Sequence, residues 1–241
     1  MNNIMIYTVT LEEHQHIVAE VLEILWTNKL YLKHVKYEFK QLETEYLELI
    51  IRYQTVKMDS TKTKGVTEWP VPTTCKELRG FLGFLNFYRQ FIKDCSKIAH
   101  PLNVLTFKKN KFKWTDKCQT AFESLETAIT TTPALFMPTA DDPFHIETDG
   151  SGIGIGVVLS QKQDNCWHPI ASISKFLSDA EWNYHAANLK MAAVIFALTE
   201  WQHYLLGAIH PFKILTDHQN LTYFHKPQDL SHWQGRCLPS R

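Results

Sequence analysis

The chain has 241 residues, 44% of them hydrophobic and 21% charged, which indicates a globular protein and excludes disorder. The formal net charge is zero, but residues 57–117 carry 13 basic and 5 acidic side chains between two acidic flanks, so we infer either a track for a polyanion or a solvated lysine-rich surface. No apolar run approaches the roughly 20 residues that span a bilayer, the start lacks signal-peptide features, and the five cysteines are scattered. We therefore expect an intracellular protein that is not secreted and has neither a disulfide framework nor a zinc site.

The first 56 residues are predicted to form a helix followed by short strands. Thr10 and Glu13 have the spacing of a capping box, and apolar residues recur behind them at helical spacing, which predicts a helix over 11–27. Between residues 30 and 56, β-branched and aromatic residues cluster, which favours two or three strands.

The basic middle of the chain is predicted to be mostly helical. A second capping box, Thr74 to Glu77, opens a helix that runs to about residue 92. Further helices are expected over 94–105 and over 116–130, the last capped by Thr115. On the first of these helices the aromatic side chains have the spacing of a core stripe, which favours packing over base stacking: Phe81, Phe84, Phe87 and Phe91.

The last hundred residues have the alternating pattern of an α/β domain. Strands are predicted over 144–148, 153–159, 167–173 and 212–215, with a long helix over 182–205 between the last two and a short helix near 220–224. The apolar stripe of the long helix is predicted to be Tyr184, Ala187, Met191, Val194, Leu198 and Trp201.

Two aspartates end apolar strands. Asp149 follows the strand at 144–148, and Asp217 follows the strand at 212–215. Ligands collect at strand ends in α/β sheets, and two carboxylates that meet there can hold a divalent cation such as Mg²⁺. Aspartate after a strand is also a common turn residue, so the two positions alone do not distinguish these alternatives.

The order of motifs resembles one family. The series T-D-G-S-G-x-G-x-G-x-V-L-S-Q from residue 148, N-Y at 183, E-W-x-H-Y-L-L-G at 200 and T-D-H-x-N-L at 216 is similar to the ribonuclease H-like domain of gypsy-type LTR retrotransposon Pol polyproteins. Upstream, V-T-E-W-P at 66, L-R-G-F-L-G-F-L-N-F-Y-R-x-F-I at 78 and F-x-W-T-x-K-C-Q-x-A-F at 112 look like the thumb and connection of the same reverse transcriptases. The resemblance runs from about residue 2 to about residue 230.

The resemblance implies an α+β and α/β architecture in three parts. Residues 1–56 are expected to be a palm remnant with a small strand unit, 57–132 a helical thumb–connection, and 133–241 a C-terminally truncated ribonuclease H-like domain with a central mixed sheet. It also implies RNA-templated DNA synthesis, and cleavage of RNA in RNA–DNA hybrids with two Mg²⁺ ions held by four carboxylates, Asp149 and Asp217 among them. A nucleic-acid duplex or hybrid is the expected partner, and the expected phosphate contacts are Lys62, Lys64, Lys76, Arg79, Arg89 and Lys93.

Several positions depart from the family's pattern. Asn2 and Asn3 stand where the polymerases carry an aspartate pair, and neutral amides cannot hold Mg²⁺ as that pair does. Lys190 stands where the second ribonuclease H carboxylate is expected, and the family's fourth acidic residue lacks a match. Glu48 replaces a glycine in the strand unit, which adds negative charge beside a bound duplex.

The helical periodicity places Lys190 at the border of the buried stripe. Its ammonium is expected either to pair with Asp149 and Asp217 in place of Mg²⁺ or to extend along the helix to solvent. We expect polymerase and nuclease activities to be lost, so that the chain at most binds nucleic acid. The alternatives are a residual Mg²⁺-dependent ribonuclease H and a polymerase subunit of a longer polyprotein, of which the second is disfavoured by Asn2 and Asn3.

Overall fold

The computed structural model describes residues 4–31, 33, 37–107, 111–139, 141–178 and 181–216. The chain divides into two compact units, Met1–Tyr53 and Gln54–Arg241. The boundaries expected after residues 56 and 132 stay predictions. The second unit contains both the helices and the C-terminal sheet, which contact each other. None of the helices in the described ranges is long and apolar enough to cross a membrane.

The first unit contains helix α1 (Leu11–Thr27) and a hairpin of β1 (Glu43–Tyr46) and β2 (Leu49–Arg52). The Thr10 side chain accepts a hydrogen bond from the Glu13 backbone amide at 3.3 Å, so the predicted cap is confirmed. The hairpin turns at Leu47 and Glu48, whose φ angles of 50° and 63° are both positive. A two-residue turn of this kind favours glycine, so Glu48 occupies a backbone conformation that is unfavourable for a side chain.

In the second unit, β3 (Thr55–Met58) leads into a helical layer and β4 (Leu135–Phe136) returns from it, and the two strands pair antiparallel. The layer holds α2 (Ser60–Thr67), α3 (Cys75–Tyr88), the 3-10 turn η2 (Arg89–Phe91), α4 (Cys95–Leu105) and α5 (Asp116–Thr131). Its core consists of apolar side chains at most 3% exposed, among them Leu78, Phe81, Leu102, Phe122 and Leu125.

Two details of the helical layer differ from the sequence expectation. The pattern gave no signal for α2, whose N-cap Asp59 accepts from the Thr61 amide at 3.0 Å. Thr115 does occupy the N-cap of α5, but its hydroxyl lies 3.2 Å from the Cys118 sulfur and makes no capping bond. The cap at Thr74 is confirmed, since its hydroxyl accepts from the Glu77 amide at 3.2 Å.

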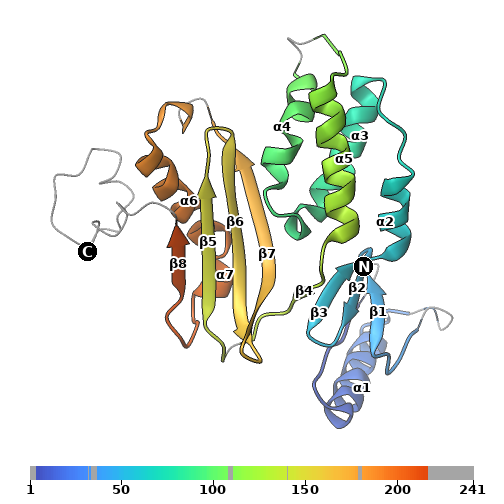
Figure 1. The fold of residues 1–241 in the computed structure, drawn as a ribbon. Coiled ribbons are helices and arrows are strands. Elements are labelled where there is room, and N and C mark those ends of the chain that lie inside the picture. Colours follow the sequence, from blue (N-terminus) through green and yellow to red (C-terminus); the bar gives the residue numbers. More distant parts are fainter. Residues whose placement is uncertain are drawn as a thin grey trace. The chain divides into compact units, whose positions relative to one another are not determined.

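The C-terminal part is a mixed four-stranded sheet in the order β7-β6-β5-β8. Strands β5 (Phe144–Gly150), β6 (Gly154–Gln163) and β7 (Cys166–Phe176) form an antiparallel meander, and β8 (Lys213–Thr216) pairs parallel with β5. Helix α6 (Ala186–Glu200) packs on β5 and β6, and α4 contacts β6 and β7 (Figure 1). The expected mixed sheet with helices is thus confirmed.

The predicted helix over 182–205 is interrupted. A 3-10 turn, η3 (Glu181–Asn183), precedes α6, and a short helix α7 (Gln202–Leu205) follows it. The predicted stripe is confirmed only in part, because Trp201 is buried but Met191, Val194 and Leu198 are only half-buried. The buried positions on α6 are instead Leu189, Lys190, Ala192, Ala193 and Ala197. Small and apolar residues surround most of this helix, so periodicity could not locate its most buried face. The helix expected near 220–224 lies outside the described residues.

Candidate functional site

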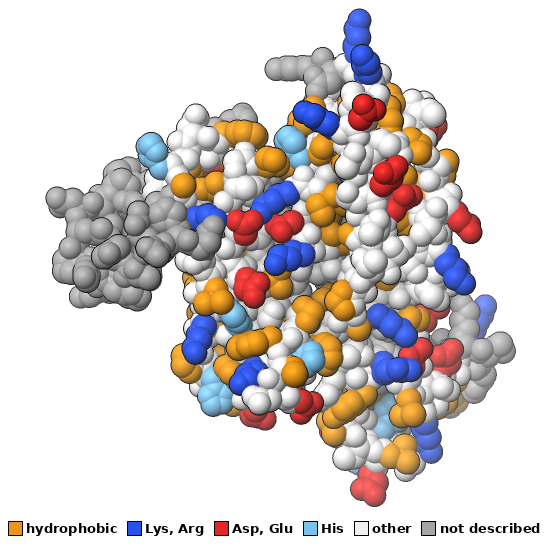
Figure 2. All heavy atoms as spheres, in the orientation of Figure 1, with side chains coloured by type: hydrophobic (Ala, Val, Ile, Leu, Met, Phe, Trp, Pro, Cys, Tyr) orange, Lys and Arg blue, Asp and Glu red, His pale blue; other side chains and the backbone are white. Residues whose placement is uncertain are grey.

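Asp149 lies near the end of β5, beside an open groove of about 360 Å³. The parallel register pairs Thr148 with Thr216, and the Thr148 hydroxyl donates to the Leu215 carbonyl at 3.2 Å. The groove is lined by Lys93, Asp94, Glu147, Thr148, Asp149, Gly156, Val158, Leu215 and Thr216. Basic and acidic side chains lie next to one another over this part of the surface rather than forming an acidic patch (Figure 2). Asp217, the second predicted carboxylate, lies outside the described residues, as do Asn2 and Asn3.

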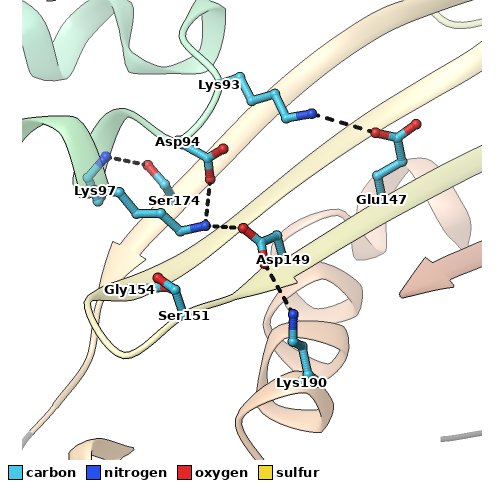
Figure 3. A network of polar contacts seen from close by, with 10 residues as sticks. Lys93, Asp94, Lys97, Glu147, Asp149, Ser151, Gly154, Ser174 and Lys190 are labelled. Atoms are coloured by element: carbon cyan, nitrogen blue, oxygen red, sulfur yellow. Dashed lines mark hydrogen bonds and ion pairs between the residues drawn. The ribbon is translucent and has the colours of Figure 1, made fainter. Parts of the chain in front are cut away.

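Lys190 reaches Asp149 from helix α6. The lysine is 7% exposed, and its Nζ lies 3.2 Å from Asp149 Oδ1 (Figure 3). The helix lies close to the strand at Gly150, where a Cβ would lie 3.3 Å from Leu189 Cγ. The predicted contact of Lys190 with Asp149 is therefore present, and extension of this side chain into solvent is excluded by its burial.

A second ammonium group, from Lys97 of α4, occupies the other oxygen of Asp149. Lys97 Nζ donates to Asp149 Oδ2 and also lies 3.0 Å from Asp94 Oδ1 (Figure 3). The sequence reasoning missed Lys97. Its spacing from Asp94 signals an i,i+3 pair, but Asp149 is 52 residues away in the chain, and no local pattern connects the two.

The start of α4 is adapted to this contact. Asp94 is the N-cap residue, but it has φ of 55° and its side chain makes no capping bond. The Ser96 amide donates instead to Ser174 Oγ on β7 at 2.9 Å. Gly156 in strand β6 leaves room for Asp94, because any residue with a Cβ at this position would collide with Asp94 Oδ1. The sheet thus supplies a cap that the helix does not make for itself, and Asp94 is left to bind Lys97.

The two lysines shift the proton equilibria of the cluster. Partial burial disfavours the charged form of Asp149, but the hydrogen bonds and charges of Lys97 and Lys190 outweigh it and lower the pKa of this carboxyl. Burial likewise disfavours the charged form of Lys97, but hydrogen bonds and charges of Asp149 and Asp94 outweigh it and raise the pKa of this ammonium. Both groups are therefore held in their ionised forms.

These shifts predict how the stability change caused by Asp149→Asn depends on pH. Because the folded-state pKa of Asp149 is lowered, its ion pairs stabilise the chain above the ordinary aspartate pKa of about 3.9, and this contribution is lost as the pH falls through the lowered pKa. The Lys97 contribution is present below the ordinary lysine pKa of about 10.4 and is lost as the pH rises through the raised pKa. We expect Asp149→Asn to lower the melting temperature by a constant amount between about pH 5 and 9. A difference that persisted unchanged at about pH 2, in thermal melts followed by circular dichroism, would contradict this assignment.

The described residues do not fit the Mg²⁺ centre that the resemblance implies. Such a centre needs several carboxylates whose oxygens face the ions. Both oxygens of Asp149 face ammonium groups instead. Glu147 points toward Lys93, with 3.8 Å between Oε2 and Nζ. Within the described ranges no three His, Cys, Asp or Glu side chains are grouped as metal ligands.

The predicted phosphate contacts lie on the helical layer, on α2, α3, η2 and the segment between η2 and α4. Lys64, Lys76, Arg79, Arg89 and Lys93 are exposed, and Lys62 is half-buried. Arg79 already makes one hydrogen bond within the chain, because its guanidinium donates to the Thr106 carbonyl at 2.9 Å.

The predicted aromatic stripe is largely a packing feature. Phe81 and Phe91 are buried, and Phe84 packs between Trp69 and Tyr88 with centroid distances of 5.5 and 4.9 Å. Phe87 is 50% exposed, so it is the member of the stripe that is open to a ligand.

Comparison with known proteins agrees with this architecture. Residues 114–214 match the family described as "RNase H-like domain found in reverse transcriptase". The chain is 35% identical over 241 residues to the Tf2-7 polyprotein of Schizosaccharomyces pombe (strain 972 / ATCC 24843), and equally to the Tf2-8 polyprotein. These matches cover 97% of this chain but only 18% of each transposon polyprotein.

The fold is also similar to solved reverse transcriptases. The foamy viral protease-reverse transcriptase dRH, in complex with double-stranded DNA, has a TM-score of 0.76 at 22% identity, over 96% of this chain and 41% of that one. The foamy viral protease-reverse transcriptase with an RNA/DNA hybrid has a TM-score of 0.73 at 21% identity, over 96% and 32% of the two chains. The chain therefore has the fold of a reverse transcriptase segment that includes an RNase H-like domain, and its sequence is similar to retrotransposon polyproteins.

Proposed function

We propose that this chain is a segment of a gypsy-type LTR retrotransposon Pol that binds nucleic acid without hydrolysing it. The observation that carries the proposal is that Lys97 and Lys190 together occupy both carboxylate oxygens of Asp149. The remainder of the polyprotein and a duplex or RNA–DNA hybrid are its proposed partners.

The chemistry of hydrolysis explains why the two ion pairs of Asp149 argue against cleavage. Two-metal cleavage uses carboxylates to hold the ions that activate water and stabilise the leaving oxygen. Asp149 is the described member of the predicted set, and its negative charge is already matched by two internal cations. Mg²⁺ would have to displace both ammonium groups, one of them on a side chain that is 9% exposed.

Binding of nucleic acid is supported by a separate set of residues. The exposed basic side chains on α2, α3 and the segment after η2 project from the helical layer. Basic groups on such a surface contact phosphates without reading sequence. The foamy viral relatives are described with double-stranded DNA and with an RNA/DNA hybrid, which are the ligands we propose here.

The proposal predicts binding without cleavage. Purified chain is incubated with a labelled RNA–DNA hybrid in Mg²⁺ or Mn²⁺, and retention is followed on a native gel. We expect intact RNA and a complex whose affinity falls by at least about tenfold between 50 and 200 mM salt. The double variant Lys64→Ala, Lys76→Ala should weaken retention, whereas Lys213→Ala on β8 removes an exposed charge elsewhere and should not.

Two outcomes would contradict the proposal. Cleavage that is abolished by Asp149→Asn would establish a residual ribonuclease H, the alternative function, which the open groove beside Asp149 would accommodate. Retention that is absent, or that does not depend on salt, would show that the basic residues do not bind the hybrid through its phosphates.

A further inference from the structure

The geometry points to a new role for Asp149: it is the structural link that holds helix α4 on the RNase H-like sheet. Lys97 carries the link to α4, and Lys190 neutralises the carboxylate from α6 on the other side (Figure 3). This inference deepens the proposed function and rests on the proposed loss of the metal centre, because it assigns the freed carboxylate to a different task.

The contact surface between α4 and the sheet is built for close approach. Gly156 leaves room for Asp94, as shown above, whereas the tight space at Gly154 is set by the neighbouring strand β7, and Lys97 lies there at ordinary contact distance. A Cβ at Gly154 would lie 2.7 Å from the Lys175 carbonyl oxygen and 3.8 Å from Lys97 Cγ. With the Ser96–Ser174 hydrogen bond at 2.9 Å, α4 is held at its first turn by one neutral bond and one charged bridge.

The charges of the cluster are balanced only when all four groups are present. Asp94 and Asp149 face Lys97, and Asp149 also faces Lys190. The side chains of Lys97 and Lys190 are 16% and 9% exposed, so water cannot replace a lost partner fully. Removing the Asp149 charge would therefore leave two poorly solvated ammonium groups near each other, with Asp94 as the remaining carboxylate beside Lys97.

The same substitution at Asp149 is expected to change the stability of the chain in opposite directions, depending on whether this residue belongs to an ion-pair cluster or to a metal centre. In a centre without its metal, clustered carboxylates repel one another, so neutralising one of them relieves repulsion. In a link between ammonium groups, neutralising the carboxylate removes the attraction. The sign of the stability change caused by Asp149→Asn, which is nearly isosteric, therefore tests the assigned role without any measurement of activity.

The experiment combines thermal melting with amide hydrogen exchange on the full chain. Asp149→Asn and Lys97→Met are each expected to lower the melting temperature by about 2–4 °C. They should also speed exchange of the Ser96 amide, while the amide of Leu125 in the core of α5 keeps its protection. Lys97→Arg preserves the charge and should lose less than Lys97→Met. Lys93→Met, which removes the exposed partner of Glu147, is the matched control and should change neither reading.

An unchanged or raised melting temperature for Asp149→Asn, or Ser96 exchange unaltered in both variants, would overturn the inference. Should Asp149→Asn fail to fold, Lys97→Met and Lys97→Arg supply the same comparison from the other end of the link. Failure of the proposed function would show separately, as cleavage of the hybrid by the unmodified chain.

Discussion

Replacing Lys190 with glutamate is expected to destabilise the metal-free chain by about 3 kcal/mol. The substitution introduces the carboxylate that the family resemblance implies at this position, but it does so at a site that is 7% exposed and beside Asp149. It removes the attraction between Lys190 Nζ and Asp149 Oδ1, which lie 3.2 Å apart, and adds repulsion between two carboxylates. Urea denaturation followed by circular dichroism measures the change. Lys190→Met, which keeps an apolar stem of similar length but carries no charge, is the matched control and should lose roughly half as much.

The response to Mg²⁺ should change with the same substitution. Two neighbouring carboxylates can bind a divalent cation, and binding to the folded state alone raises stability by mass action. We therefore expect Mg²⁺ to recover part of the loss in Lys190→Glu and to leave the unmodified chain and Lys190→Met unaffected. If Lys190→Glu were no less stable than Lys190→Met, or if Mg²⁺ stabilised the unmodified chain, the ion pair would not be the reason that Lys190 is tolerated.

Phe81→Ala is expected to destabilise the helical layer by about 3–5 kcal/mol. The Phe81 side chain is fully buried on α3, and its ring centroid lies 4.7 Å from that of Phe122 and 5.7 Å from that of Trp69. Truncation removes these contacts and leaves a cavity between α3, α5 and the segment after α2, which cannot collapse freely. Equilibrium urea unfolding, followed by tryptophan fluorescence, measures the loss.

Phe87→Ala is the matched control, because Phe87 lies on the same helix but is 50% exposed. We expect the free energy of unfolding of the Phe87→Ala variant to remain within about 0.5 kcal/mol of that of the unmodified chain. The pair also separates packing from ligand contact. If Phe87 stacks on a base, Phe87→Ala should weaken retention of the labelled hybrid without changing the melting temperature. Equal destabilisation by the two variants would contradict the burial difference between them.

The sequence was sufficient where the interactions are local. The capping boxes at Thr10 and Thr74 join groups within one helical turn, so residue spacing alone predicts them. The replacement at Lys190 was visible by counting from a motif, but the expected helix left open whether this side chain contacts Asp149 or extends to solvent. The apolar stripe of α6 was predicted only in part, because a helix with alanine and apolar residues on most sides has weak periodicity.

By itself, the sequence determined most of the order of helices and strands, the mixed architecture, and the presence of a lysine where a metal-binding carboxylate is expected. Only the tertiary structure decided what Asp149 does with that lysine and with a second one. The reason is that Lys97 and Asp149 are separated by 52 residues, and they meet where α4 packs on the sheet with its Asp94 side chain over Gly156 of β6. Packing of this kind depends on how two elements meet in space, which the periodicity of neither element specifies.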